Sequence, residues 1–329
     1  MPSDAAVPMR VAFVGAFASR LAELVRPLLA ASCEAIAGDV PEILPRLVDV
    51  DVIVSMVFTP EMAAAAPRLR LVQVAGAGTD RVDRAALRPG VLLANAFGHE
   101  DGIADHAIGA MIALSRDFAR LDAALRQGRW ESQWKVGAPA PPLWPELGGR
   151  TLGLLGFGHI GEAVARRAAA FGMRIVAIGR RARPAPPGIA WIGGPERLEE
   201  MLREADHLVV SVPLDDATRG LLDARRLGLM KPGAILVNVA RGEVVDEAAL
   251  YEALKHRRLA AAALDVWYRY PAAPGATMPA TLPFHELPNV LMTPHSSGWT
   301  EGMLTGRART VAENIARLAR GEPPLNAIG

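Results

Sequence analysis

The stretch LLGFGHIGEAV at residues 154–164 decides the fold class of this chain. Gly156, Gly158 and Gly161 have the spacing G-x-G-x-x-G, with an apolar strand candidate before them and an amphipathic helical segment after them. Glycines at these positions permit a tight turn, a close approach of the backbone to a pyrophosphate, and close packing of helix on strand. A glycine-rich turn without a ligand is the alternative. The context favours a dinucleotide site at the first strand of a doubly wound sheet.

Strand candidates and helical segments alternate on both sides of this stretch, which is typical of parallel sheets covered by helices. Six strand candidates begin at Thr151: TLGLLGF, RIVAIGR, HLVVSVP, AILVNVA, AAALDVW and NVLMTPH. Four precede it: VAFVGAF (11–17), DVIVSMV (51–57), LRLVQVAG (69–76) and GVLLANA (90–96). We therefore predict an α/β protein with two doubly wound parallel-sheet domains, joined by long helices over 100–128 and 300–321. A proline-rich connection at 137–149 leads into the second sheet.

The predicted domain arrangement is an insertion. Residues 1–99 and 296–329 would form a flavodoxin-like substrate domain, and residues 100–295 would form the larger, Rossmann-type dinucleotide-binding domain inserted into it. A chain of 329 residues is long enough for two such cores.

Composition excludes several classes of partner. With 36 basic and 35 acidic residues the formal net charge is +1, which gives no reason to expect nucleic acid or an anionic membrane. Cys33 is the only cysteine, so we expect a buried structural thiol and a reducing compartment. The start of the sequence lacks a basic region followed by a cleavable apolar core, and no apolar run reaches membrane-spanning length. We expect a soluble, cytoplasmic protein.

The end of the second strand indicates which cofactor binds. An NAD site usually has an acid there, about twenty residues beyond the glycine loop, to bind the ribose 2′-hydroxyl. This chain reads IVAIGRRARP, with Gly179 at that point, followed by Arg180, Arg181 and Arg183. A glycine leaves room and the guanidinium groups favour a phosphate, so we predict NADP(H), with NAD as a possible cofactor. An ordinary solvated basic turn is the alternative.

Five further segments carry chemistry: VQVAGAGTD (72–80), SVPLDDATRGLL (211–222), NVARGEVVDEAAL (238–250), LDVWYRYP (264–271) and NVLMTPHSSGWT (289–300). With the glycine loop they make the chain resemble the D-isomer-specific 2-hydroxyacid dehydrogenase family over nearly its whole length. The resemblance implies that Arg241 pairs with the substrate carboxylate and carbonyl, and that His295 is the acid/base group. It also implies that backbone N–H groups at Ala77 and Gly78 receive the carboxylate; a purely structural turn is the alternative there.

The resemblance assigns the remaining cofactor contacts and the oligomeric state. Asp265 would bind the nicotinamide carboxamide, and Val239 and Ala240 would line the nicotinamide face. Backbone amides at His159 and Ile160 would meet the pyrophosphate. The other family cofactor positions fall on Val212, Pro213, Thr218, Ser297 and Gly298. A homodimer formed through the helix before Thr151 is also implied.

One position departs from the family pattern. Relatives typically read L-D-V-F-x-x-E-P, with the glutamate hydrogen-bonded to the catalytic histidine, whereas LDVWYRYP has Tyr270 at that place. Without the carboxylate the His295 imidazolium loses an opposite charge, so we expect its pKa to be lower than in relatives. The tyrosine hydroxyl can still orient the ring. The other six histidines are interpreted as structural or surface residues, and none is spaced with a second ligand, so we expect no metal site.

These residues predict an oxidoreductase that transfers a hydride between NADP(H) and a small 2-keto acid/D-2-hydroxy acid pair, with glyoxylate or hydroxypyruvate reduction as a plausible direction. A formate- or phosphite-type dehydrogenase is an alternative, because the histidine partner is neutral. A nucleotide-sensing interaction protein, similar to the family's corepressors, is another. Candidates for the pocket walls are Trp130, Trp134, Trp144 and Trp299.

Overall fold

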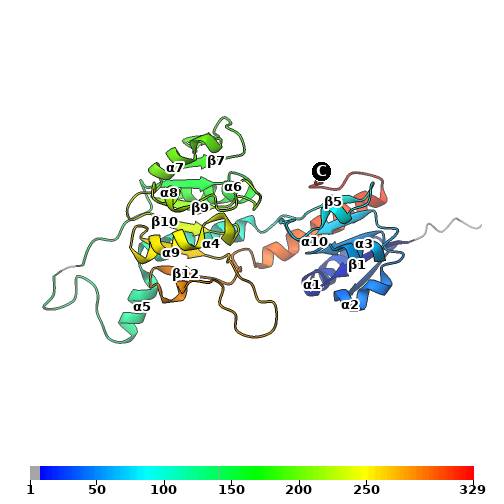
Figure 1. The fold of residues 1–329 in the computed structure, drawn as a ribbon, viewed down its shortest axis with the longest axis horizontal. Helices are drawn as coiled ribbons and strands as arrows, with labels where there is room; N and C mark the ends of the chain where they lie inside the picture. Colours follow the sequence, from blue (N-terminus) through cyan, green and yellow to red (C-terminus); the bar gives the residue numbers. More distant parts are fainter. Residues whose placement is uncertain (1–7, 140) are drawn as a thin grey trace, which may run out of the picture. The chain divides into compact units, whose positions relative to one another are not determined.

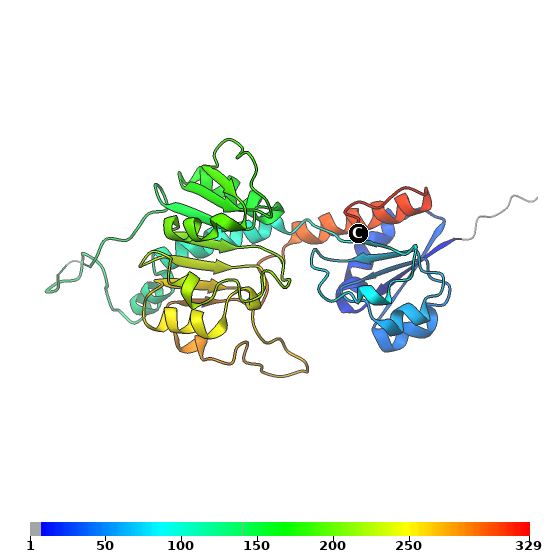
Figure 2. The ribbon, with the colours of Figure 1, turned by 45° about the horizontal axis from the view of Figure 1, so that its top comes forward.

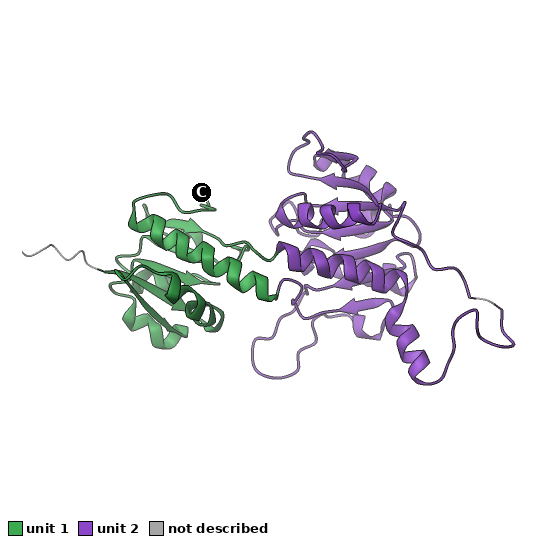
Figure 3. Cartoon of the chain, turned by 180° about the vertical axis from the view of Figure 1, so that it is seen from behind, with its two compact units in different colours: residues 1–99, 299–329 green, residues 100–298 purple. Residues whose placement is uncertain are grey.

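Runs of buried aliphatic residues form two separate sheets, and each pair of neighbouring strands in the described chain is parallel (Figure 1). The structure is a computed structural model that describes residues 8–139 and 141–329. The polar lead at 1–7 and Ala140, in the proline-rich connection, lie outside the described residues. The first compact unit comprises the chain up to His99 together with Trp299–Gly329, and the second is Glu100–Gly298 (Figure 3). The chain returns to the first unit at Trp299, three residues later than the predicted boundary at residue 296.

The sheet of the first unit has five strands in the order β2-β1-β3-β4-β5, the flavodoxin-like order of doubly wound folds. Its strands are β1 Met9–Val14, β2 Cys33–Gly38, β3 Val52–Ser55, β4 Leu71–Val74 and β5 Leu92–Ala94. Strand β2 was not predicted, because its sequence CEAIAG is short of large apolar residues and it lies at the sheet edge. The expectation that Cys33 is buried was wrong for the same reason: it is half-buried on this edge strand. Partial burial raises the pKa of the thiol.

Helices cover both faces of this first sheet. α1 Ala16–Val25 and α10 Glu301–Ala319 share one apolar cluster, while α2 Val40–Ile43 and α3 Pro60–Ala65 share the other (Figure 3 shows α10 lying along the sheet). The helix predicted over 300–321 is therefore α10, which begins after Thr300, whose Oγ1 accepts a hydrogen bond from Met303 N at 3.4 Å. Short 3₁₀ helices follow at Arg26–Leu28, Leu44–Arg46 and Arg84–Ala86.

The second unit contains a seven-stranded sheet in the order β12-β11-β10-β9-β6-β7-β8 (Figure 2). Its strands are β6 Thr151–Leu155, β7 Arg174–Ile178, β8 Trp191–Gly193, β9 His207–Val210, β10 Ile235–Asn238, β11 Ala261–Leu264 and β12 Val290–Met292. Six of these strands were predicted from the sequence; β8 was not, because it is only three residues long and lies at the edge of the sheet. Strand order reverses between β6 and β9, and ligands of such sheets bind at this switch point, outside the carboxyl ends of the strands. The predicted α/β fold with two parallel-sheet domains is confirmed.

Helices also cover both faces of the second sheet. α4 Glu100–Ser115 and α6 His159–Ala170 lie on one face, and α7 Leu198–Glu204, α8 Ala224–Leu227 and α9 Glu247–Lys255 lie on the other. Short 3₁₀ helices occur at Pro195–Arg197, Gly242–Val244 and Phe284–Glu286.

The predicted single helix over 100–128 is two helices, α4 and α5 Phe118–Arg126. They are separated at Asp117, whose left-handed backbone (φ 52°) interrupts the helical hydrogen bonding. Between α5 and β6, the described residues 127–139 and 141–150 contain no helix or strand (Figure 1). Within 8–139 and 141–329, no helix has both the length and the apolar character needed to cross a bilayer.

Candidate active site

The three glycines of the loop after β6 are required for different structural reasons. Gly156 has φ 108°, and a Cβ on it would lie 2.9 Å from the carbonyl carbon and Oγ of Ser211. A Cβ on Gly161 would lie 2.3 Å from the carbonyl oxygen of Gly156, so helix α6 and its strand could not pack as closely. Gly158 differs, because a Cβ there would meet nothing within 4 Å. Packing therefore explains two of the glycines, and the third leaves open space at the start of α6, as an approaching pyrophosphate requires.

His159 and Ile160 follow directly as the first residues of α6. Their N–H groups belong to the first helical turn and so have no acceptor within the helix. The loop is braced by Ser211 Oγ, which donates to the carbonyl of Gly156 at 3.2 Å. The first turn of α6 thus begins at the glycine loop, and the contact of its N–H groups with a pyrophosphate stays a prediction.

The arginines after β7 are in two different situations. Arg183 donates from Nη2 to the carbonyl of Phe157 at 3.0 Å and pairs with Glu162 Oε1 at 3.0 Å, so it belongs to the glycine loop. Arg180 and Arg181 are exposed, and neither has a hydrogen bond or ion pair to any residue that the structure describes. The guanidinium groups of Arg180 and Arg181, beside Gly179, are therefore available to bind a phosphate. That of Arg183 already contacts Phe157 and Glu162.

Arg241 follows β10 in a turn that the side chain of Asn238 organises. Asn238 is 1% exposed; its Nδ2 donates to the carbonyl of Arg241 at 2.9 Å and its Oδ1 accepts from Ala240 N at 3.0 Å. Gly242 is required by a close approach, since a Cβ there would lie 2.6 Å from the carbonyl carbon and oxygen of Trp267. The sequence pattern did not predict a role for the asparagine of N-x-A-R-G, and the structure shows that its side chain holds the backbone of Arg241.

His295 lies in the segment after β12 and has a left-handed backbone, with φ 56°. The carboxylate of Asp265, 1% exposed at the end of β11, anchors the segment on both sides of it. Asp265 accepts from Thr293 Oγ1 at 2.6 Å, Ser296 N at 2.8 Å and Ser297 N at 3.0 Å. Burial opposes ionisation of this carboxyl, but hydrogen bonds from Ser297 and Thr293 outweigh it and lower the pKa of Asp265. A charged acceptor thus offsets the cost of placing a non-glycine residue in this conformation.

Tyr270 and His295 form a hydrogen bond, with 2.9 Å between Tyr270 Oη and His295 Nδ1. The phenol oxygen also accepts a long hydrogen bond of 3.4 Å from Trp267 N. Burial raises the pKa of Tyr270, while the hydrogen bond from Trp267 and the nearby positive charge of Arg241 lower it less. The hydroxyl is therefore neutral at physiological pH. The segments that carry Arg241, Tyr270 and His295 meet at the carboxyl ends of β10, β11 and β12.

The other predicted site residues follow strand ends as expected, but their side chains differ in exposure. Val239 and Ala240 are each 6% exposed directly after β10. Thr218 closes the loop after β9, since its Oγ1 donates to the carbonyl of Pro213 at 2.7 Å and accepts from Asp215 N at 2.8 Å. The rest of this group is Val212, half-buried, Ser297, buried, and Gly298, half-buried.

Ala77 and Gly78 lie in the first unit, after β4. Within the described part of the chain, their backbone N–H groups have no acceptor, whereas Ala77 O accepts from Asn95 Nδ2 at 2.7 Å. Trp130 and Trp134 are exposed on the segment between α5 and β6, and Trp299 contacts the ring of Phe17. No group of three or more His, Cys, Asp or Glu among the described residues is arranged to hold a metal ion.

Comparison with known proteins places this architecture in a family. Residues 108–297 match the sequence model of the D-isomer specific 2-hydroxyacid dehydrogenase, NAD binding domain. A glyoxylate reductase of Korarchaeum cryptofilum is 36% identical, over 87% of this chain and 85% of its own length. A crystal structure of a Thermus thermophilus protein covers 98% of this chain and 100% of its own, with 32% identity and a TM-score of 0.78. A D-isomer specific 2-hydroxyacid dehydrogenase from Xanthobacter autotrophicus Py2, solved with NADPH and MES, covers 98% of both chains, with 27% identity and a TM-score of 0.79.

The fold, the glycine loop and these matches define an NAD(P)-dependent oxidoreductase with a nicotinamide dinucleotide cofactor. The chain belongs to the D-isomer specific 2-hydroxyacid dehydrogenase family. The predicted family and enzyme class are confirmed. The reaction class is hydride transfer between the nicotinamide cofactor and a keto acid/hydroxy acid pair.

Proposed function

We propose that this enzyme uses NADPH to reduce a small 2-keto acid to the D-2-hydroxy acid. The observation that carries the proposal is the meeting of the Arg241, Tyr270 and His295 segments at three neighbouring strand ends, in the unit that also contains the glycine loop. An arginine fork, a titratable imidazole and a dinucleotide site are the three components that carbonyl reduction of an anionic substrate needs.

The roles of the three side chains follow from their chemistry. Arg241 binds the carboxylate and polarises the carbonyl oxygen, since its rigid fork presents parallel N–H donors. A bound nicotinamide would supply the hydride for reduction of the carbonyl. His295 donates its proton from Nε2 to the oxygen that becomes the alkoxide, and regains a proton from solvent. Tyr270 holds the ring by a hydrogen bond at Nδ1, and we assign the proton transfer to the other ring nitrogen, Nε2.

The preference for NADPH is supported by Gly179, Arg180 and Arg181. The first of these leaves no carboxylate at the end of β7, and the two arginines have no partner among the described residues. A 2′-phosphate would gain two charge-assisted contacts there without displacing an existing ion pair. Solved relatives include one in complex with NADPH.

Glyoxylate or hydroxypyruvate is the proposed substrate, since curated relatives are named glyoxylate reductase. Because the partner of His295 is the neutral hydroxyl of Tyr270, one alternative reaction remains: oxidation of formate or phosphite. Initial rates with glyoxylate, hydroxypyruvate, formate and phosphite, each with both cofactors, test the proposal. We expect rapid NADPH oxidation with a 2-keto acid. Cofactor reduction by formate or phosphite, with no turnover of any 2-keto acid, would replace it by this alternative.

We also propose that the enzyme is a homodimer. Large apolar side chains are exposed on α5 and on the segment before β6, among them Phe118, Trp134, Val136 and Leu143. A second copy that covers this apolar surface would remove it from water. Light scattering on the purified protein checks this, because one chain has a mass of 34.9 kDa. A solution mass equal to that of one chain would exclude it.

A further inference from the structure

The connection between β7 and β8, residues 179–190, contains neither helix nor strand and includes three prolines. All of its residues are described, and only Arg183 among them forms a hydrogen bond through its side chain to another described residue. The backbone of Arg183 is also held, because its N–H donates to Ile192 O at 3.4 Å and the two residues form an isolated antiparallel bridge. The side chain of Arg183 therefore attaches this connection to the elements that it contacts.

The guanidinium group of Arg183 contacts two parts of the nucleotide-binding element at once. Its Nη2 donates to the carbonyl oxygen of Phe157 at 3.0 Å and to Glu162 Oε1 at 3.0 Å. Its Cζ lies 5.3 Å from the centroid of the Phe157 ring, which is a cation–π distance. Phe157 lies in the glycine loop, and Glu162 lies in the first turn of α6. One cation thus contacts both the glycine loop and the start of the helix.

The position of Glu162 raises an electrostatic problem for cofactor binding. The N-terminus of a helix attracts anions, because its N–H groups and its dipole are positive there. In a dinucleotide-binding fold, the helix after the glycine loop takes the pyrophosphate at this end. A carboxylate in the same turn interacts favourably with the dipole but repels a second anion. Glu162 alone would therefore weaken the binding of any dinucleotide, whatever its 2′ substituent.

Arg183 supplies the charge that offsets this repulsion, since its guanidinium nitrogen lies 3.0 Å from the carboxylate and the pair has no net charge. The two side chains are 51% and 45% exposed, so the pair contributes little to the stability of the fold. An anion that binds beside the pair still experiences the difference between a neutral pair and a bare carboxylate. This separates Arg183 from Arg180 and Arg181, which have no hydrogen bond or ion pair to any residue that the structure describes.

We propose that Arg183 is a positioning residue for the cofactor, which neutralises Glu162 so that the first turn of α6 accepts the pyrophosphate of NADPH and of NADH alike. The three arginines after β7 then have different tasks. Under the proposed function Arg180 and Arg181 select NADPH, whereas Arg183 contributes equally to the binding of both cofactors. This role depends on the family's nicotinamide cofactor and not on the identity of the substrate. A binding measurement without a keto acid therefore stays informative if the proposed substrate is wrong.

Fluorescence titration with NADPH and with NADH, in the absence of a keto acid, tests the proposal. Arg183→Ala should raise both Kd values by the same factor, about three- to tenfold at low ionic strength, the scale of one uncompensated charge near the surface. The factor should fall as salt is added, because screening weakens the repulsion. Adding Glu162→Gln to Arg183→Ala should return both Kd values to within about twofold of the unsubstituted enzyme, since no bare carboxylate remains. Arg183→Lys should retain most of the affinity, because an ammonium keeps the charge.

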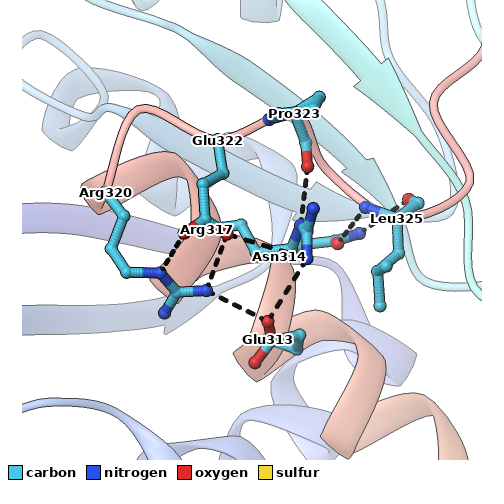
Figure 4. Close-up of polar contacts among 7 residues, drawn as sticks. All are labelled: Glu313, Asn314, Arg317, Arg320, Glu322, Pro323 and Leu325. Atoms are coloured by element: carbon cyan, nitrogen blue, oxygen red, sulfur yellow. Dashed lines mark hydrogen bonds and ion pairs between the residues drawn. The ribbon is translucent and has the colours of Figure 1, made fainter.

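Arg320→Ala is the matched control for this experiment. Arg320 forms exposed ion pairs with Glu313 and Glu322 in the first unit (Figure 4), and its side chain is 49% exposed, close to that of Arg183. This variant should bind NADPH and NADH as the unsubstituted enzyme does. Glu162→Gln alone tests the carboxylate without changing Arg183, and it should bind both cofactors at least as tightly as the unsubstituted enzyme.

Several results would overturn the inference. Unchanged Kd values in Arg183→Ala would show that the ion pair does not affect the cofactor. A loss of affinity for NADPH alone would make Arg183 a ligand of the 2′-phosphate instead. A loss with both cofactors that Glu162→Gln does not restore would assign the effect to the contact with Phe157 and not to charge. Weaker binding in Glu162→Gln alone would contradict the repulsion on which the inference depends.

Discussion

At the scale of single residues, His295 has a neutral tyrosine hydroxyl as its hydrogen-bond partner. A carboxylate would stabilise the imidazolium by its charge, whereas the Tyr270 hydroxyl offers a hydrogen bond of 2.9 Å and no charge. Burial raises the pKa of Tyr270, so ionisation of the phenol does not supply the missing charge. Tyr270 therefore orients the imidazole ring of His295 but does not stabilise its protonated form by an opposite charge.

We predict that Tyr270→Glu shifts the alkaline limb of the kcat/KM profile for glyoxylate reduction upward. Reduction needs protonated His295, so the rate falls as pH rises through the pKa of the imidazolium. A carboxylate at hydrogen-bonding distance stabilises that cation and should move the limb by about one pH unit or more. Initial rates from pH 5 to 9 measure the shift.

Tyr270→Phe is the matched control for this experiment. Removing the hydroxyl should reduce kcat/KM by about 0.5–1.5 kcal/mol without raising the alkaline limb. If the glutamate variant keeps the original profile and the phenylalanine variant keeps full activity, Tyr270 merely lines the pocket.

We predict that Arg241→Ala loses about 2–5 kcal/mol in kcat/KM, the scale for truncating one partner of a buried charge pair. Arg241→Lys should recover only part of this loss, because an ammonium keeps the charge and lacks the parallel donors. Steady-state kinetics with glyoxylate measure both. NADPH titration serves as the control, since neither change should weaken cofactor binding; near-normal kcat/KM in the alanine variant would refute the assignment.

We predict that the double substitution Arg180→Ala, Arg181→Ala lowers kcat/KM for NADPH by about 1.5–3 kcal/mol, the range for hydrogen bonds to a charged group. The value for NADH should not change, because NADH has no 2′-phosphate. Arg174→Ala is a control at the opposite end of β7, where the arginine pairs with Glu204. An equal decrease in kcat/KM with NADPH and with NADH would show that the two arginines do not bind the 2′-phosphate.

At the scale of elements, the segment after β12 depends on an acceptor from the neighbouring strand. Asp265 satisfies the N–H groups of Ser296 and Ser297, on one side of His295, and the hydroxyl of Thr293 on the other. Trp267 Nε1 adds a hydrogen bond to the carbonyl of Thr293 at 2.8 Å. Asp265 and Trp267, after β11, thus hold the backbone on both sides of His295, as Asn238 holds the backbone of Arg241.

We predict that Asp265→Asn destabilises this segment by about 1–3 kcal/mol, because its amide NH₂ would face a buried backbone N–H. Thr293→Val removes only the hydroxyl and should cost about 0.5–1.5 kcal/mol. Amide hydrogen exchange of 293–298 in the cofactor-free enzyme measures the local opening directly. Equal protection in both variants and the unsubstituted enzyme would mean that another contact holds His295 in place.

At the scale of the whole molecule, one buried histidine links stability to pH. His207, 4% exposed at the start of β9, contacts Ser115 Oγ through Nε2 at 3.2 Å, which joins α4 to the sheet. Burial lowers the pKa of His207 to about 4. The unfolded chain binds a proton near pH 6.5 and the folded chain does not. The contribution of His207 to stability is therefore lost as pH falls from about 6.5 to about 4, and this contribution is constant above that window.

We predict that protonation of His207 lowers the free energy of unfolding by up to about 3 kcal/mol between pH 6.5 and about 4. This is the scale set by the difference between the two pKa values. His207→Gln should flatten the pH dependence of the urea midpoint between pH 6.5 and 4.5, because glutamine does not titrate. Ser115→Ala keeps the buried imidazole and should retain the slope. An unchanged slope in His207→Gln would assign the acid sensitivity to other groups.

Local patterns predicted most of the fold and supplied the candidate site residues, whose roles stay predictions. The glycine spacing, the apolar strands and the motif around Arg241 each involve only a few consecutive residues. They can therefore be recognised in the sequence without knowledge of tertiary contacts. The edge strands β2 and β8 were missed because edge strands are short and half-exposed, and carry no strong apolar run. The break at Asp117 was missed because a left-handed residue inside a helical pattern leaves no compositional signal.

The sequence by itself determined the fold class, the dinucleotide loop and the absence of a carboxylate at position 270. Tertiary structure alone decided that Arg183 is engaged by Glu162 while Arg180 and Arg181 are not. It also decided that Asp265 holds the left-handed His295 and that Asn95 fixes the Ala77 carbonyl. The reason is physical: these contacts join residues far apart in the chain, and their geometry exists only after the strands that carry them have been paired.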